Sequence, residues 1–260
     1  MFKRFYEIFE YIDMITGWVK RDLRGRYKGS LLGFAWNLIT PLCQIIVYYV
    51  VFSTVFNNEI QNFHIYLVTG MVPWNFFSEA IIQGAASIVA NADMTKKIYF
   101  PREVLPISSV ASRFVNLLLT LSIVMVLILI SGHGLNLKMF PWLLVTLLIE
   151  FVLALAVALL LSAINVYYHD IEYITNVIMM VVIWVTPIMY SLDSINTGYL
   201  SIIVKLNPMT TLIDAYHKIL YYKQIPNIDS LLFLLVMAVV LLIISENIFI
   251  RLEKKFAEEL

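Results

Sequence analysis

Six long apolar stretches dominate this chain of 260 residues and restrict its fold more than any other feature. An α-helix needs about 20 apolar residues to cross the hydrocarbon core of a bilayer, and each stretch is close to that length or longer. With 61% apolar and 14% charged residues, the composition excludes a soluble globular domain, in which about a quarter of the residues are charged. The sequence therefore predicts an all-α integral membrane protein with six transmembrane helices, at 31–56, 65–90, 107–131, 140–166, 174–192 and 229–250.

Lysine and arginine are distributed unequally between the two ends of these predicted helices. Thirteen lie in the N-terminal segment through Ser30, the loop at 94–106 and the tail after Ile250, whereas the connections on the opposite side hold four. Because basic residues are retained on the cytoplasmic side, we expect a multi-pass protein of the inner (cytoplasmic) membrane with both termini in the cytoplasm. The net charge of zero gives no indication of a nucleic-acid partner.

Residues 1–30 are expected to form a cytoplasmic segment in front of a membrane domain at 31–260. Apolar side chains recur at helical spacing at Phe2, Phe5, Phe9 and Ile12, with charged side chains on the opposite face. This pattern is typical of an amphipathic helix that lies in the membrane interface and contacts lipids, and a soluble tail helix is the alternative. A dense group of basic residues at 20–28 follows it.

The connection between the fifth and sixth predicted helices is too apolar for a solvated loop. Asn207 followed by Pro208 predicts a helix start, with a capping side chain and then proline at the first helical position. The helix that follows covers roughly 24 Å, which is too short to cross comfortably. Because the chain must return to the cytoplasm, we expect a short re-entrant helical pair at 199–222, and a hairpin lying flat in the interface is the alternative.

Motifs of catalytic chemistry are absent from the sequence. It contains no G-x-x-x-x-G-K-[ST] phosphate loop, no H-E-x-x-H, no G-x-S-x-G and no C-x-x-C, so no catalytic and no metal site is predicted. A charge within the predicted spans is costly unless it faces protein or water, which makes candidates of Glu79, Arg113, Glu150 and Glu246. For Glu150, lining a path and pairing between helices are both open, and for Arg113 snorkelling to the cytoplasmic interface is an alternative.

A short charged stretch at 94–106 carries two aromatic residues in an unusual place. Its three basic residues put it on the cytoplasmic side, and its two prolines interrupt any continuous helix. Tyr99 and Phe100 are therefore expected to be exposed on a basic knob at the membrane surface. They would either bind a partner or act as plain interfacial anchors.

This stretch, K-K-I-Y-F-P-R-E-V-L-P at 96–106, resembles the cytoplasmic coupling segment of ABC-2 class permeases, in particular those that export O-antigen and related surface polysaccharides. The stretches R-Y-K-G-S-L-L-G-F-A-W at 26–36 and N-P-M-T-T-L-I-D-A-Y at 207–216 resemble the segments before the first and last spans of that family. The resemblance implies a homodimer that exports a polyprenyl-diphosphate-linked polysaccharide. Two copies of a separate ABC ATPase subunit would bind Mg-ATP, and this chain would hold no cofactor.

The same resemblance implies roles for particular residues. The coupling stretch would dock on the ATPase, with a second contact in the turn at 165–172, although His169 stands where the family typically has arginine. The implied coupling residues are Lys96, Lys97, Tyr99, Phe100, Pro101, Arg102, Glu103 and Asp170. The first and fifth spans would line a channel, with candidate residues Tyr48, Phe52, Phe56, Trp184 and Tyr190, and lipid contact is the alternative for the aromatic stripe on the first span.

The re-entrant pair would lie near the exit of that channel. Its candidate residues are Asn207, Pro208, Tyr216 and Ile219, of which Tyr216 and Ile219 are expected to be accessible from outside. In the fifth span, Pro187 is expected to kink the helix.

Other functions remain open on the sequence. Capsule polysaccharide or teichoic acid would be alternative cargoes of such a permease. Outside this class, Glu79 and Glu150 would suit a proton-coupled carrier. A membrane-embedded glycosyl- or prenyl-transferase would require clustered acidic residues at a membrane face, and the sequence shows none.

Overall fold

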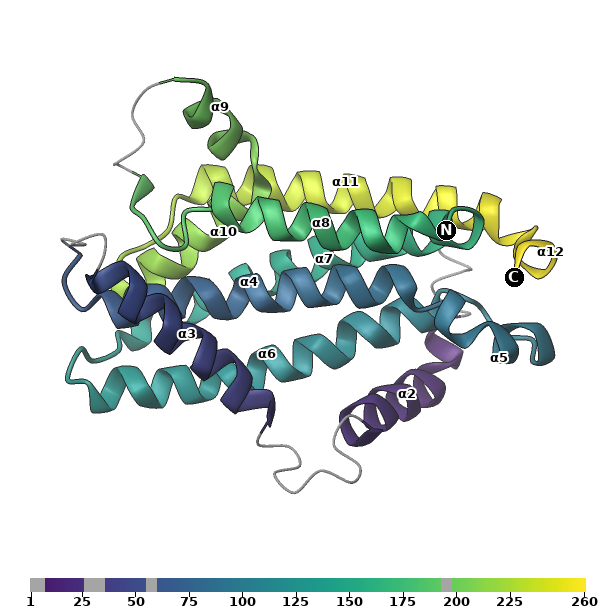
Figure 1. The fold of residues 1–260 in the computed structure, drawn as a ribbon, viewed down its shortest axis with the longest axis horizontal. Coiled ribbons are helices and arrows are strands. Elements are labelled where there is room, and N and C mark those ends of the chain that lie inside the picture. Colours follow the sequence, from purple (N-terminus) through teal and green to yellow (C-terminus); the bar gives the residue numbers. More distant parts are fainter. Residues whose placement is uncertain (1–7, 26–35, 55–59, 193–197) are drawn as a thin grey trace.

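The computed structural model describes residues 8–25, 36–54, 60–192 and 198–260, and within these ranges all regular secondary structure is helical, as predicted (Figure 1). The helices are α2 (Ile12–Gly25), α3 (Trp36–Thr54), α4 (Phe63–Ala86), α5 (Ala92–Lys97), α6 (Val104–Ile130), α7 (Phe140–Tyr167), α8 (Asp170–Val185), α9 (Tyr199–Leu206), α10 (Pro208–Tyr216), α11 (Ile228–Glu253) and α12 (Phe256–Glu259), with short helical turns at η2 (Val89–Asn91), η3 (Leu137–Met139) and η5 (His217–Tyr221).

Four helical segments are long and apolar enough to cross a membrane, namely Phe63–Ala86, Val104–Ile130, Leu137–Tyr167 and Ile228–Glu253. They coincide with the second, third, fourth and sixth predicted spans. The first and fifth predicted spans correspond to α3 and α8, which have 19 and 16 residues.

The fifth predicted helix ends earlier than expected. α8 ends at Val185, and Thr186 after it is extended, with φ −91° and ψ 132°. The residue before a proline is biased away from the helical conformation, so Pro187 terminates the helix instead of kinking it. The Thr186 hydroxyl donates to the Val182 carbonyl over 2.8 Å and satisfies one of the last acceptors of the helix.

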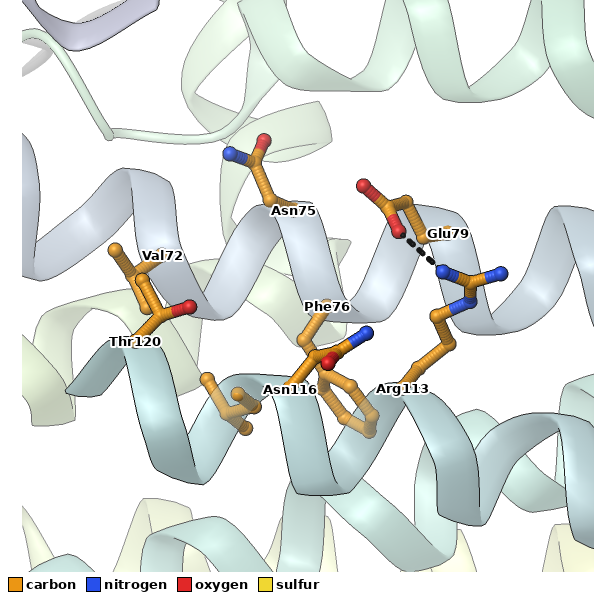
Figure 2. A pocket seen from close by; sticks show the side chains of 8 residues that line it. Val72, Asn75, Phe76, Glu79, Arg113, Asn116 and Thr120 are labelled. Carbon is orange, nitrogen blue, oxygen red and sulfur yellow. Dashed lines mark hydrogen bonds and ion pairs between the residues drawn. The ribbon is translucent and has the colours of Figure 1, made fainter. Parts of the chain in front are cut away.

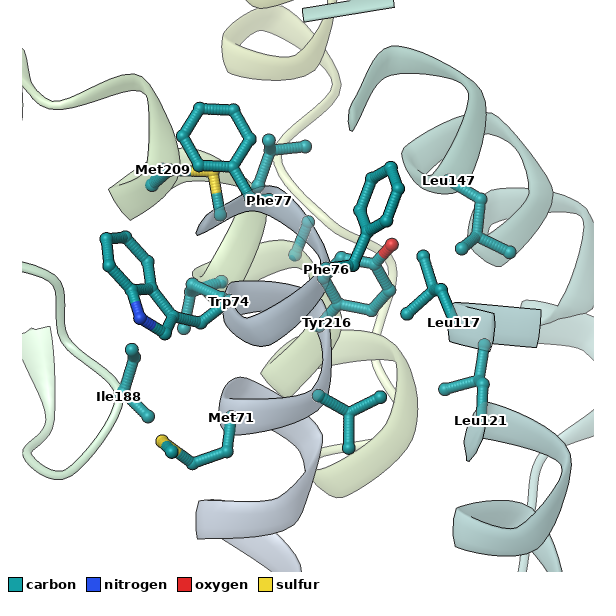
Figure 3. Close-up of a cluster of buried hydrophobic side chains, with 14 of the residues drawn as sticks. Met71, Trp74, Phe76, Phe77, Leu117, Leu121, Leu147, Ile188, Met209 and Tyr216 are labelled. Carbon is teal, nitrogen blue, oxygen red and sulfur yellow. The ribbon is translucent and has the colours of Figure 1, made fainter. Parts of the chain in front are cut away.

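The centre of the bundle is α4, which packs against α6, α7, α8 and α10 and is the most buried of the long helices. Figure 3 shows Met71, Trp74 and Phe76 of α4 among side chains from α6, α7 and α10. At Gly84 the backbones of α4 and α7 approach closely, because an added Cβ would lie 2.5 Å from the Cβ of Ala158. Small residues are what allow such close helix contacts in membrane proteins.

The connections gather at two opposite ends of the bundle. One, here called the α5 end, carries α5, α12 and the start of α8, and the other, the α10 end, carries α9, α10 and the connection from α6 to α7 (Figure 1). The amphipathic helix α2 lies along α6 near the α5 end. Ile8 and Ile15 are buried against the bundle, whereas Phe9 and Ile12 are exposed, so the described part of the predicted amphipathic segment has two apolar faces. Phe2 and Phe5 lie outside the described residues.

Candidate functional site

The predicted coupling stretch forms a turn between α5 and α6 at the α5 end. The chain leaves α5 at Ile98, which is extended, with φ −126° and ψ 136°. Tyr99 projects outward and is 91% exposed, whereas Phe100 is 4% exposed and packs among buried side chains that include Val104 and Phe249. The prediction that both aromatic residues are exposed is right for Tyr99 and wrong for Phe100.

Arg102 faces the body of the protein. Its Nη1 lies 3.6 Å from Oε1 of Glu253 near the end of α11, and its backbone N–H donates to the same oxygen over 3.4 Å. Pro101 and Glu103 on either side are buried. This half of the stretch fixes the turn to α6 and α11, which differs from the outward contact that we predicted for it.

The outward half of the stretch forms a surface that we call the coupling face, defined by its four exposed residues, Lys96, Lys97, Ile98 and Tyr99. Asp170, the second predicted contact, is exposed in the first turn of α8 at the same end of the bundle (Figure 1). Asn165 fixes this turn, because its side chain donates to the Ala85 carbonyl and accepts from the Glu172 N–H, both over 3.2 Å. The turns that carry the two predicted ATPase contacts are therefore each held to the bundle by hydrogen bonds and packing.

A polar pocket lies between α4 and α6, within the segments long enough to cross the membrane. Asn75 and Glu79 of α4 and Arg113, Asn116 and Thr120 of α6 line it, and we call it the polar seam (Figure 2). These residues recur at intervals of three and four along their helices, so they share one line of contact. Arg113 is 2% exposed, and its Nη1 donates to Oε2 of Glu79 over 3.2 Å.

Arg113 also holds α2 against the bundle. Its Nη2 lies 3.9 Å from Oδ2 of Asp22, and the Ser112 hydroxyl donates to the same oxygen. An arginine at membrane depth is stable when it is paired in this way. The Arg113 guanidinium lies between the carboxylates of Asp22 and Glu79, and since Asp22 belongs to the amphipathic helix α2, snorkelling to the cytoplasmic interface stays a prediction.

Glu150 and Tyr216 form a buried pair between α7 and α10. Neither side chain is exposed, and the Tyr216 hydroxyl donates to Oε2 of Glu150 over 2.5 Å. Within the described residues, Oε1 of Glu150 has no hydrogen-bond partner. Of the two roles open for Glu150, the geometry supports pairing between helices.

The start of α10 is capped as predicted. Oδ1 of Asn207 accepts from the Met209 N–H over 3.0 Å, and Pro208 occupies the first helical position. The Asn207 amide donates to the Thr186 hydroxyl over 2.9 Å and joins α10 to the end of α8. Ile219, like Tyr216, is buried. The expectation that these two side chains are accessible from outside is wrong, because α10 and η5 turn their apolar face toward α4, α7 and α11.

The predicted channel residues lie on α3 and on α8 with the segment after it. Tyr48 is partly buried and packs against the core, and Trp184 is exposed on α8. The Tyr190 hydroxyl donates to the Trp184 carbonyl over 3.2 Å. The side chain of Phe52 and the whole of Phe56 lie outside the described part of the chain. Both helices expose further aliphatic side chains, which are available to lipid or to a second copy.

Comparison with protein families agrees with this architecture. The sequence model described as "ABC-2 type transporter" matches residues 15–221. The chain belongs to the ABC-2 type transporter family. It is therefore a multi-pass membrane permease and a transmembrane subunit without a catalytic domain of its own, and an exporter permease of this kind implies an ATPase partner.

Curated relatives match the permease over most of its length. The O-antigen export system permease protein RfbA of Myxococcus xanthus is 33% identical over 257 residues, which cover 98% of each chain. A protein of the same name from Klebsiella pneumoniae is 28% identical over 253 residues, 97% of each chain. The polysialic acid transport protein KpsM of Escherichia coli is more distant, at 21% identity over 200 residues, 75% of the permease and 76% of KpsM. The family resemblance seen in the three sequence stretches is confirmed.

Sequence reasoning missed a cleft at the α10 end of the permease. This α10 cleft has a volume of about 410 Å³ and is lined by Tyr66, Pro187, Ser191, Leu192, Asp214, His217, Lys218, Tyr222 and Gln224. Its lining comes from α4, from the segment after α8 and from α10 with η5 and the residues after it, which lie far apart in the sequence. α10 passes into a π-helical turn at His217–Tyr221, which changes which side chains share a face. The only signal in the sequence is the run of polar and aromatic residues at 214–224.

Proposed function

We propose that the permease exports a polysaccharide linked to a polyprenyl diphosphate, of the O-antigen type, across the cytoplasmic membrane. It would act as a homodimer with two copies of a separate ATPase that binds Mg-ATP. The observation that carries this proposal is the similarity, over 98% of both chains, to an O-antigen export permease. Capsule polysaccharide is the second candidate cargo, favoured by the weaker similarity to a polysialic acid transport protein.

The coupling face is our proposed contact with the ATPase. Tyr99 supplies a fully exposed aromatic ring on a fixed turn, and aromatic anchors dominate the energetics of protein interfaces. Lys96 and Lys97 beside it would act at the rim, on encounter rate and on lipid head groups. Phe100 and Arg102 lie behind the coupling face and would transmit force from the ATPase to α6 and α11. Asp170 would form a second, smaller contact.

Six spans with both termini in the cytoplasm would put the coupling face inside and the α10 cleft outside. The excess of basic residues on the connections at the α5 end supports this orientation. Reporters fused after Phe100 and after Tyr168 are expected to report the cytoplasm, and one fused after Gly134 the outer side. An outward signal after Phe100 would overturn the proposed orientation and, with it, the coupling face.

The exposed apolar faces of α3 and α8 support a homodimer with a channel beside them. Aromatic rings suit the apolar faces of sugars, so Tyr48, Trp184 and Tyr190 are proposed contacts for a glycan in that channel. Phe52 and Phe56 keep the same proposed role. The short segment of α9 and α10 is proposed to be re-entrant, so that it dips in from the outer side and returns to it, with the capped start of α10 at Asn207 and Pro208 in the turn between the two helices.

Export by the complete complex tests the proposed function. The permease and its cognate ATPase would be expressed in cells that make a lipid-linked O-antigen but lack their own exporter. We expect polysaccharide on the surface of intact cells, detected with antibody. With an ATPase whose nucleotide-binding lysine is replaced, the glycan should accumulate inside. A complex that assembles and hydrolyses ATP but leaves O-antigen inside would contradict the cargo, and export of polysialic acid instead would move the permease to the capsule class.

A further inference from the structure

The α10 cleft brings together chemical groups that the transport scheme above does not use. We propose that this cleft is a binding site for sugar units of the exported glycan on the outer side of the membrane. The inference rests on the proposed function, because it takes a glycan as the cargo, and it adds a contact outside the proposed channel helix faces. The volume of the α10 cleft, about 410 Å³, lies within the range of roughly 300–1,000 Å³ typical of small-ligand sites, so the cleft would hold a short part of a glycan.

The groups that line the cleft suit a neutral polyhydroxylated ligand. Oδ2 of Asp214 and Nζ of Lys218 form an ion pair of 2.8 Å, and both side chains remain partly exposed. A carboxylate and an ammonium side by side can accept from one sugar hydroxyl and donate to its neighbour. Gln224 and Ser191 add an amide and a hydroxyl, and Tyr222 adds an aromatic ring. An apolar ring with a few convergent polar groups is the usual composition of such a site.

The charge balance argues against an anionic ligand. Asp214 and Lys218 form an ion pair in the lining, so their charges cancel, and the His217 ring beside them is buried against Tyr66. A diphosphate would require an excess of positive charge, which this lining does not supply. The sugar part of a lipid-linked glycan therefore fits the cleft better than its diphosphate part.

The wall behind these groups is held rigidly. The rings of Tyr66 and His217 stack with their centroids 3.7 Å apart, and Nε2 of His217 lies 3.1 Å from the Tyr66 carbonyl oxygen. Gly70 makes this stack possible, since an added Cβ would lie 2.8 Å from Nε2 of His217. The Tyr66 hydroxyl donates to the Tyr190 carbonyl over 3.0 Å and so fixes the segment after α8, which forms the opposite wall.

The backbone beneath the cleft is irregular in two places. The π-helical turn His217–Tyr221 is of a kind that is rare and frequently found at functional sites. Lys223 follows with a φ of 56°, in the left-handed region that lysine seldom adopts. The Gln224 N–H donates to the Lys218 carbonyl over 2.7 Å, which closes the turn and holds Gln224 beside the ion pair. Such strain persists where the surrounding structure fixes it, and it is concentrated at binding sites.

Photocrosslinking in exporting cells tests the site with the native glycan as the probe. A photoreactive amino acid would replace Leu192, which lines the cleft, or Leu206, an exposed leucine of α9 at the same end that does not line it. The permease would be expressed with its ATPase, irradiated, purified and stained for periodate-sensitive sugar. We expect glycan on the permease labelled at position 192, dependent on an active ATPase, and little on the one labelled at 206.

Two variants then connect the label to the proposed contacts. Tyr222→Ala and Asp214→Asn should each lower glycan labelling at position 192 by about five-fold, as expected for the loss of one stacking or charge-assisted contact. Tyr199→Ala, which removes an exposed tyrosine of α9 outside the cleft, is the matched control and should leave labelling unchanged.

The outcomes separate this proposal from the proposed function. If the wild-type complex exports no glycan, the proposed function fails. If it exports glycan normally but positions 192 and 206 are labelled equally, or if both cleft variants label like wild type, the permease keeps its function and the sugar site in the α10 cleft is wrong.

Discussion

The coupling stretch at the α5 end and the tyrosines buried at the α10 end use aromatic rings in opposite ways. At the α5 end, Tyr99 projects with 91% of its surface exposed, while its neighbour Phe100 is buried. At the α10 end, Tyr66 and Tyr216 are buried, and their hydroxyls donate to the Tyr190 carbonyl and to Glu150. A buried tyrosine whose hydroxyl is hydrogen-bonded already has its contacts within the protein. A projecting ring instead gains contact energy when a partner covers it.

The difference indicates what each end is built to do. The α5 end offers one aromatic residue and two lysines on a fixed turn, an arrangement suited to contact with a soluble subunit. At the α10 end the hydroxyls of Tyr66 and Tyr216 are bonded within the protein, and the stacked rings of Tyr66 and His217 form a wall of the α10 cleft, an arrangement suited to a small ligand. Variants of Phe100, Tyr99 and Tyr216 test whether buried and projecting aromatic residues differ in this way.

Phe100→Ala should have the largest effect, and it should act on stability. Truncating a buried phenylalanine costs about 3–5 kcal/mol, because packing is lost and a cavity remains. We expect a lower midpoint of thermal unfolding for the purified permease and faster proteolysis of the turn after α5. Phe100→Leu should keep most of the stability. Unchanged stability together with lost ATPase binding in Phe100→Ala would mean that Phe100 contacts the ATPase directly, and the contrast with Tyr99 would disappear.

Tyr99→Ala should have the next largest effect, and it should act on binding alone. Loss of an aromatic anchor at an interface costs about 2 kcal/mol or more, which is a weakening of roughly 30-fold. Co-elution with the ATPase and cargo-stimulated ATP hydrolysis should fall, while the unfolding midpoint stays as in wild type. Lys96→Ala should keep most activity, since rim charges contribute less. Full complex formation by Tyr99→Ala would identify the ring as a lipid anchor.

Tyr216→Phe should have a smaller effect at the α10 end, again on stability. It removes the hydrogen bond that the buried Glu150 carboxyl accepts from Tyr216, at a cost of about 1 kcal/mol in a membrane interior. A double-mutant cycle with Glu150→Gln would measure the coupling between the two side chains. Tyr216→Cys should resist polar thiol reagents from outside, whereas Tyr222→Cys should react. Rapid modification of Tyr216→Cys would instead support the original expectation that this residue lies at the exit of the transport path.

The long helices could be predicted from the sequence because length and apolarity alone determine them. The sixth predicted span, 229–250, corresponds to Ile228–Glu253, and the helix start at Asn207 followed from capping chemistry. These features are local, so neighbouring residues contain the information.

The errors concern which way a side chain points and what it meets. Tyr99 and Phe100 are neighbours in the turn after α5, yet one is exposed and the other buried, which composition does not specify. Arg113 is paired with Asp22 from a distant helix, and no local pattern identifies that partner. Tyr216 was expected to be accessible from outside, but whether its side chain meets protein or a channel depends on how α10 docks on its neighbours.

Of the single variants above that are expected to lose stability, Arg102→Ala should lose less than Phe100→Ala and Tyr216→Phe, because the Arg102–Glu253 ion pair is partly exposed and worth about 0.5 kcal/mol. Glu253→Ala should cost more, since it removes both the ion pair and the acceptor of the Arg102 backbone N–H. If the pair positions Tyr99, both variants should weaken ATPase binding in that same order, and the exchanged pair Arg102→Glu with Glu253→Arg should recover part of it. If Arg102 instead contacts the ATPase, Arg102→Ala should be inactive, Glu253→Ala should bind normally, and the exchanged pair should stay inactive. Measuring co-elution and ATP hydrolysis for these three variants decides between a positioning residue and a contact, and so fixes how much of the coupling stretch the ATPase touches.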